Sequence, residues 1–161
     1  MTRRQAREYV LQSLFQLEFT GKTPDRRELL DFMKDNPPTN ETLEFIDDLL
    51  KGTIEHMAEL DALIQRACKH WELDRLAAID RNIMRFASYE IIYRADIPYA
   101  VTINEAVDIA RRFSTEDSYS FINGVLDKIA HQKYDKAATG KRADKKPDKM
   151  VSKRAVKERQ A

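Results

Sequence analysis

The chain has 161 residues, a length that suggests one domain at roughly 150 residues per domain. Hydrophobic residues make up 42% of it, enough for a packed core, while the 34% of charged residues indicate a well-solvated surface. No stretch approaches the ~20 apolar residues of a membrane span. Residues 1–4 are not followed by the apolar run of a secretory signal. The single Cys68 excludes an internal disulfide. We therefore expect a protein of the reducing cytoplasm, without a metal or a cofactor.

The net charge of +1 hides an asymmetry along the chain. From Lys133 onward there are 11 Lys/Arg against 4 Asp/Glu, which leaves 17 against 23 in the preceding part. The expected organisation is a helical domain over residues 1–134 and a disordered basic tail over residues 135–161. Such a tail either adds nonspecific affinity for polyanions or serves only to solubilise the protein.

Apolar residues in the first half recur at helical spacing. Thr2 is placed to cap a first helix that runs to about Phe19, with Gly21 beyond its end. Pro24 suits the first turn of a short second helix, which the Asn-Pro-Pro sequence of residues 36–38 ends.

A longer helical pattern runs from Glu41 to Ile64. Gly52 lies inside it and lowers the helix propensity, so the segment is expected to bend or to split in two. After it, the His70-Trp71-Glu72 sequence has a reactive appearance, but we interpret Trp71 as a packing anchor at a helix junction.

The second half shows three further helices. One covers about Ile79 to Ile91 and ends before Ile97-Pro98. The sequence Thr102-Ile103-Asn104-Glu105 has the pattern of a capping box that opens the next helix. Ser114 or Thr115 is then expected to cap a last helix, whose apolar spacing stops near Tyr134. No alternating run bounded by turn residues indicates a strand, so the predicted fold class is all-α.

Catalytic patterns are missing or weak. The three histidines are scattered without metal-ligand spacing, and no glycine-rich phosphate loop is present. The adjacent carboxylates of Asp47-Asp48 and Glu116-Asp117 point apart on a helix, because neighbouring residues face different sides. We predict that the protein is not an enzyme.

The first helix carries features suited to RNA. Arg3, Arg4 and Arg7 crowd its first turns, and Arg4, Leu11 and Phe15 fall on one stripe beside the buried face. Guanidinium groups pair with phosphates, and unstacked bases lie on accessible rings, so this combination fits single-stranded RNA. The alternative is that Phe15 belongs to the core and the arginines are ordinary surface.

A second cluster spans the junction of the last two helices. It contains Arg111, Arg112, Asp117, Tyr119 and Phe121. The residues alone leave open whether this is a second RNA-facing region or a solvated face above a buried Phe121.

Several strings, taken together in this order, resemble the NusB family of bacterial transcription antitermination factors. They are Arg3-Arg4-Gln5-Ala6-Arg7-Glu8, Gln12 with Leu14-Phe15, Asp80-Arg81 with Arg85, Ala87 and Tyr89-Glu90, Ile97-Pro98-Tyr99 with Val101, Ile103-Asn104-Glu105-Ala106, and Phe121-Ile122-Asn123-Gly124-Val125-Leu126-Asp127. The resemblance runs from about Arg3 to Lys128; between about Thr20 and Cys68 it rests only on helical pattern.

The resemblance implies a fold of two small helical bundles and an RNA site of eight residues. These are Arg3, Arg4, Arg7, Phe15, Arg85, Arg111, Asp117 and Phe121. The arginines of the first helix would contact the RNA backbone, with Phe15, where the family often has Tyr, close to the bases. Phe121 would stack on a base, and Asp117 would accept hydrogen bonds from bases or hold an arginine. Asn123 and Gly124 are expected to serve close helix packing.

The resemblance also implies partners. Proteins of the family bind the boxA element of ribosomal RNA leader transcripts, join the ribosomal protein NusE, and help the transcribing RNA polymerase complex to ignore termination signals. Two alternatives stay open: a helical adaptor that binds only protein, and a stand-alone relative of the NusB-like domain of ribosomal RNA cytosine methyltransferases.

Overall fold

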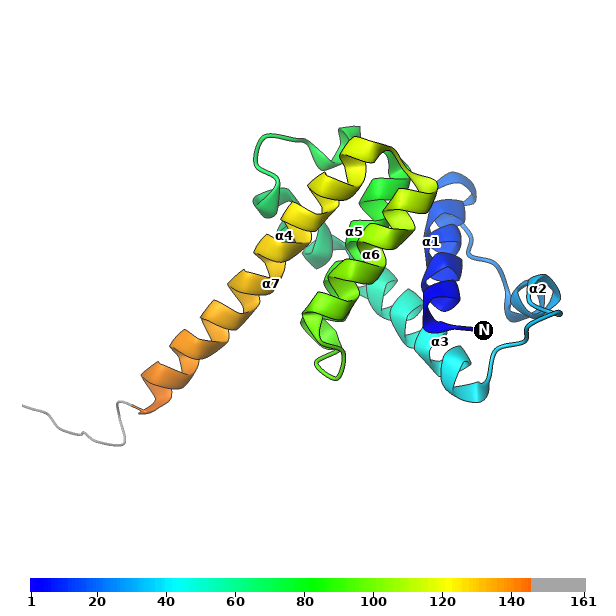
Figure 1. Cartoon of the computed structure of the whole chain (residues 1–161), viewed down its shortest axis with the longest axis horizontal. Coiled ribbons are helices and arrows are strands. Elements are labelled where there is room, and N and C mark those ends of the chain that lie inside the picture. Colours follow the sequence, from blue (N-terminus) through cyan, green and yellow to red (C-terminus); the bar gives the residue numbers. More distant parts are fainter. Residues whose placement is uncertain (146–161) are drawn as a thin grey trace, which may run out of the picture. The chain divides into compact units, whose positions relative to one another are not determined.

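The computed structural model describes residues 1–145, and the side chains of residues 1–133 other than residue 32. Within these residues the chain forms seven α-helices and one short 3₁₀ turn, and no strand (Figure 1). In chain order they are α1 (Arg3–Thr20), α2 (Arg26–Phe32), α3 (Asn40–Glu55), α4 (Met57–Ala67), η1 (Leu73–Arg75), α5 (Ala78–Tyr93), α6 (Tyr99–Phe113) and α7 (Glu116–Lys145). The predicted all-α class is confirmed.

Local interactions fix the ends of α1. The Thr2 hydroxyl accepts a hydrogen bond from the Gln5 amide, and the Gln5 side chain accepts one from the Thr2 amide, at 3.1 and 2.8 Å. Both atoms satisfy amides that have no partner inside the helix. At the other end Gly21 adopts a left-handed φ of 76°, which favours glycine. Both predicted ends are confirmed to within a residue.

Three predicted boundaries differ from the structure. Pro24 precedes the capping Asp25 instead of lying inside α2. The long pattern does split, but at His56, between α3 and α4. The predicted capping box at Thr102 is wrong, because α6 already begins at Tyr99 and the Thr102 hydroxyl donates to Glu90 at 2.8 Å.

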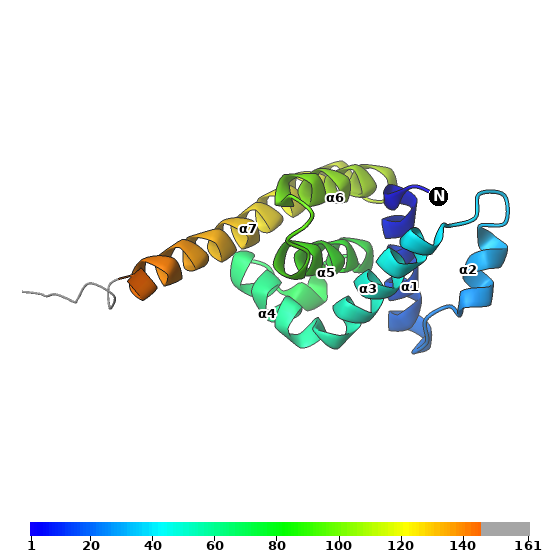
Figure 2. The same ribbon diagram turned by 90° about the horizontal axis from the view of Figure 1, so that it is seen from below.

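Helix α5 organises the core. It packs against α1, α3, α4 and α6, and Figure 2 shows α6 on one side of it and α4 on the other. Helix α1 also packs against α3 and α6, and α3 against α4, so the helices surround a shared core. The largest fully buried side chains in it are Leu14, Ile46, Leu49, Leu60, Ile64, Ile83, Met84, Phe86, Ile109, Ile122, Leu126 and Ile129.

Helix α7 continues past the point where the apolar spacing stops. The chain divides into two units, Met1–Ile129 and Ala130–Ala161, and every site described below lies in the first. The last helix reaches Lys145, whereas the sequence predicted its end near Tyr134. The rest of the expected tail, residues 146–161, lies outside the described residues, and the domain boundary at residue 134 stays a prediction. No helix of the described part is long and apolar enough to span a membrane.

Candidate nucleic-acid interface

Arg3 and Arg4 lie exposed on the first turn of α1. The Arg3 guanidinium carbon is 4.5 Å from the centre of the Phe45 ring, a cation–π contact that orients the side chain without neutralising it. Arg4 is 45% exposed and forms ion pairs with Glu105 and Asp108 of α6. Arg4 therefore shares its charge with two carboxylates, while Arg3 lies over an aromatic ring.

Arg7 lies in the interior, contrary to its predicted role at the RNA backbone. Its side chain is 3% exposed and donates two hydrogen bonds to Glu90, at 2.6 and 2.9 Å. Glu105 accepts a further, longer bond from Arg7 at 3.4 Å. A phosphate would have to displace these carboxylates, so we reassign Arg7 from RNA contact to holding α1 against α5 and α6.

Arg85 of α5 is also largely enclosed, at 12% side-chain exposure. It donates to Asp61 of α4 at 2.7 and 2.9 Å and to Glu18 of α1 at 2.8 Å. Burial raises the pKa of Glu18, but the hydrogen bond and charge of Arg81, together with the charge of Arg85, outweigh it and lower that pKa. The predicted contact of Arg85 with RNA is corrected in the same way: Arg85 ties α5 to α1 and α4.

Phe15 stands at the border of the core, as predicted for an accessible ring. It is 37% exposed, and its ring centre is 4.7 Å from that of Phe19. It lines an apolar hollow of about 350 Å³ together with Ile79 and Phe113. Phe113, the last residue of α6, is also partly exposed.

The junction between α6 and α7 is fixed by Asp80, a buried carboxylate of α5. It accepts hydrogen bonds from the hydroxyls of Ser114 and Ser118, at 2.5 and 2.7 Å. These bonds set the direction in which α7 starts, and with it the positions of Asp117 and Phe121. Asp117 is exposed, and Phe121 is half-buried.

The structure joins the two arginine clusters that the sequence showed separately. Asp108 of α6 contacts Arg4 at 2.7 Å and Arg111 at 3.6 Å. Arg111 is 58% exposed and lies over the Tyr119 ring at 4.7 Å. Arg112, next to it, pairs with Glu8 of α1 at 3.1 Å. Asp108 thus links an arginine of α1 to one of α6, and we call the exposed residues Arg3, Arg4, Arg111 and Arg112 the arginine surface.

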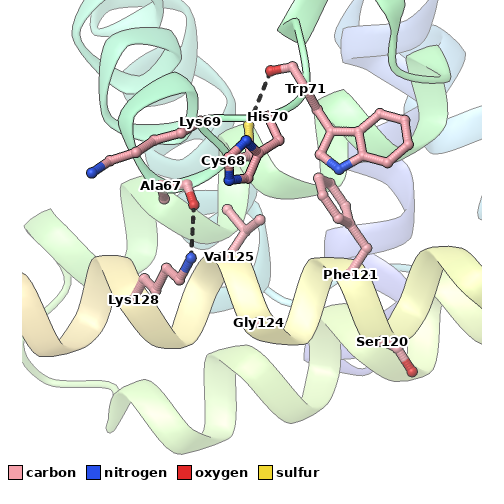
Figure 3. Close-up of a pocket in the computed structure, with 10 residues that line it drawn as sticks. All are labelled: Ala67, Cys68, Lys69, His70, Trp71, Ser120, Phe121, Gly124, Val125 and Lys128. Atoms are coloured by element: carbon pink, nitrogen blue, oxygen red, sulfur yellow. Dashed lines mark hydrogen bonds between the residues drawn. The ribbon is translucent and has the colours of Figure 1, made fainter.

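Phe121 lies beside Trp71, a neighbour that the sequence did not suggest. Its ring meets Trp71 edge-on, with centres 6.2 Å apart (Figure 3). Trp71 does lie at a helix junction, but 58% of it is exposed, so its interpretation as a packing anchor is wrong. Gly124 is not in close helix packing either, since a Cβ there would meet nothing within 4 Å. The sequence interpretation missed this aromatic pair, because only the fold brings residue 71 to α7.

An all-helical protein with exposed arginines and accessible aromatic rings has the features of a helical nucleic-acid-binding protein. Within the described residues no group of three or more His, Cys, Asp or Glu side chains could hold a metal ion. The chemistry available here is electrostatic attraction and stacking, which matches that class.

Comparison with known proteins makes the assignment specific: the chain belongs to the NusB family, whose model matches residues 4–131. It is 45% identical over 141 residues to the transcription antitermination protein NusB of Thermodesulfovibrio yellowstonii, covering 82% of this chain and 93% of that relative. It is 46% identical over 138 residues to that of Desulforamulus reducens, covering 86% of this chain and 95% of the relative.

Solved structures agree with this assignment. The fold is similar to that of T. maritima NusB, with a TM-score of 0.72 and 37% identity over 81% of this chain and 92% of the other. It is also similar to a crystal structure of the antitermination factors NusB and NusE in complex with double-stranded RNA. There the TM-score is 0.69 at 25% identity, over 82% of this chain and 99% of that one.

Proposed function

We propose that this protein is a transcription antitermination factor that binds boxA RNA of ribosomal RNA operon transcripts together with the ribosomal protein NusE. The observation that carries the proposal is the similarity to the protein seen with NusE and RNA, which extends over 99% of that chain. The protein performs no chemistry in this role. It acts on nascent transcripts, in the cytoplasm, by holding RNA and NusE at the transcribing RNA polymerase complex.

The proposed RNA site contains fewer residues than the sequence suggested, because Arg7 and Arg85 are left out. Arg3, Arg4 and Arg111 supply charge to the RNA backbone, because all three are exposed and two of them meet at Asp108. Phe15 and Phe121 supply accessible rings. Asp117, which is exposed next to the Phe121 ring, accepts hydrogen bonds from base edges, since a carboxylate repels phosphate.

A gel-shift titration tests this function directly. The full chain is titrated against single-stranded boxA-like RNA, a scrambled single strand and a duplex of the same sequence, each with and without NusE. We expect the boxA-like single strand to bind most tightly and NusE to raise its affinity. Equal binding of all three RNAs would contradict the proposed specificity, and binding of NusE without any RNA would favour the helical adaptor.

We further propose that the basic residues beyond the helical domain add nonspecific affinity. The argument is the excess of Lys and Arg from Lys133 onward, against an acidic excess before it. Removing residues 146–161 should lower affinity for boxA-like and scrambled RNA by the same factor and reduce the salt dependence of both. Unchanged affinities would indicate the solubilising role instead.

A further inference from the structure

A groove of about 370 Å³ lies beside Phe121 (Figure 3). One wall is the turn that follows α4, with Lys69, His70 and Trp71. The other is the face of α7 that carries Phe121, Gly124 and Lys128. The proposed function so far uses only Phe121 of this groove.

The turn that carries Trp71 is fixed by hydrogen bonds, while the Trp71 ring is exposed. Its backbone carbonyl accepts a hydrogen bond from the Gln65 side chain at 2.6 Å, and its amide donates to the Cys68 carbonyl at 3.0 Å. The Gln65 oxygen in turn accepts from the Leu73 amide at 3.0 Å, which pins the turn on its other side. The backbone of the turn is thus fixed by its own hydrogen bonds, while the indole ring remains more than half exposed.

The floor of the groove is open and apolar. Gly124 contributes no side chain, and no heavy atom would lie within 4 Å of a Cβ placed there. Cys68 lies buried below, where burial raises the pKa of its thiol and keeps it neutral. A flat ring can therefore approach the backbone of α7 beside Phe121 and Trp71.

The rim of the groove is basic although the body of the protein is acidic. Lys69, His70 and Lys128 line it, and no carboxylate does so among the described residues. Lys128 donates to the Ala67 carbonyl at 3.3 Å, which places its ammonium at the rim. An ammonium has three donors, so Lys128 keeps two for an anion.

We propose that this groove holds one further nucleotide of the bound RNA strand, next to the base that contacts Phe121. The base stacks on Trp71 over the open floor at Gly124, and the Lys69, His70 and Lys128 side chains face its phosphates. Aromatic rings beside cations are the combination that single-stranded RNA sites use. The inference rests on the proposed RNA-binding function and extends its site by five residues of this chain.

Trp71 provides a direct readout because it is the only tryptophan of the chain. The full-length protein is titrated with boxA-like RNA, and with oligouridine as a probe without sequence preference. The anisotropy of the labelled RNA and the emission of Trp71 are measured together. We expect the emission to be quenched along the same binding curve as the anisotropy, and the bound ring to be protected from acrylamide.

Gly124→Leu adds a large side chain at the groove floor, where a Cβ would meet no heavy atom within 4 Å, and Gly124→Ala adds a small one. Both replace a helical glycine by a better helix former, so both should keep or raise the melting temperature. Gly124→Leu should weaken RNA binding and reduce the Trp71 quenching, and Gly124→Ala, which adds only one methyl group, should do both to a smaller extent. Trp71→Ala should weaken binding roughly 5- to 150-fold, the range for one stacked base, and Trp71→Phe should retain most of it.

The outcomes separate the two proposals. If RNA binds by anisotropy while Trp71 emission stays constant and Gly124→Leu binds normally, the groove is not an RNA site and the proposed function stands. If RNA does not bind at all, both the proposed function and this inference are contradicted. Quenching that requires NusE and not RNA would overturn the inference in favour of a protein-binding groove.

Discussion

Arg7 of α1 and Glu90 of α5 form a doubly hydrogen-bonded ion pair in the interior, at 2.6 and 2.9 Å, with side-chain exposures of 3% and 0%. Thr102 of α6 donates to the same carboxylate at 2.8 Å. Three helices therefore meet at one charge pair. Both charged groups are removed from water. If one partner were deleted, the other would remain as an unpaired charge in the interior, which is energetically costly.

Removing one partner of this pair should be severely destabilising. We expect Arg7→Ala to lower the free energy of unfolding by about 3–5 kcal/mol, because Glu90 would stay buried and uncompensated. The double variant Arg7→Met with Glu90→Met should recover much of that loss. Urea unfolding followed by circular dichroism measures both, with the exposed Arg111→Ala as the control. A loss below about 1 kcal/mol for Arg7→Ala, the size typical of a surface pair, would contradict the structural role.

Gly52 of α3 makes room for the Tyr89 ring of α5. A Cβ on Gly52 would lie 2.1 Å from Cζ of Tyr89, closer than any real contact. Gly52→Ala should therefore cost about 1–3 kcal/mol of stability through overpacking. The same change at Gly124, where space is open, should instead stabilise the helix by roughly 0.5–1 kcal/mol. Thermal unfolding of the two variants should shift in opposite directions; a stabilised Gly52→Ala would show that the contact is not tight.

The Tyr89 hydroxyl makes stability depend on pH in the alkaline range. Burial and the hydrogen bond to Asp48, at 2.9 Å, raise the pKa of Tyr89 to about 12 from its ordinary 10.0. The folded state then binds this proton more tightly than the unfolded chain does, so its contribution is complete below pH 10 and is lost as the pH rises toward 12. Tyr89→Phe should lose less stability than the wild type between pH 10 and 12, measured by urea unfolding at each pH. Parallel curves for the two proteins would rule out the assignment.

Local chemistry could be predicted from the sequence, and tertiary partners could not. The ends of α1 follow from Thr2, Gln5 and Gly21, whose interactions reach only a few residues along the chain. The capping pattern at Thr102 failed because its hydroxyl has a distant partner in Glu90 and Pro98 had already set the start of the helix. A short pattern is reliable only where no tertiary contact competes with it.

The candidate site shows the same division. Arg3, Arg7 and Arg85 are alike in the sequence as arginines on helices. Arg7 is buried because it pairs with Glu90, which lies 83 residues further along the chain. Arg85 is largely enclosed because it pairs with Asp61 and Glu18. The family resemblance carried no information on which arginines are paired with carboxylates in this chain, and the RNA site itself stays a prediction.

The arginine surface should govern how RNA affinity responds to salt. Each of Arg3→Ala, Arg4→Ala and Arg111→Ala should reduce the slope of log affinity against log salt by roughly 0.7 if it removes one phosphate contact. The fold should be retained, because all three side chains are exposed. Arg27→Ala, an 88% exposed arginine outside the proposed site, is the matched control. An unchanged slope in the triple variant would exclude this surface from the RNA path.

The affinity of Phe121→Ala for boxA-like single-stranded RNA, with NusE present, tests the central claim most directly. Stacking of one base on an aromatic ring is worth about 1–3 kcal/mol, so the loss of the ring should weaken binding roughly 5- to 150-fold. Phe121→Tyr keeps the ring and should bind nearly as the wild type does, and a melting curve shows that both variants are folded. The account predicts weak binding by a folded Phe121→Ala and strong binding by Phe121→Tyr. A folded Phe121→Ala that binds this RNA as tightly as the wild type would contradict it.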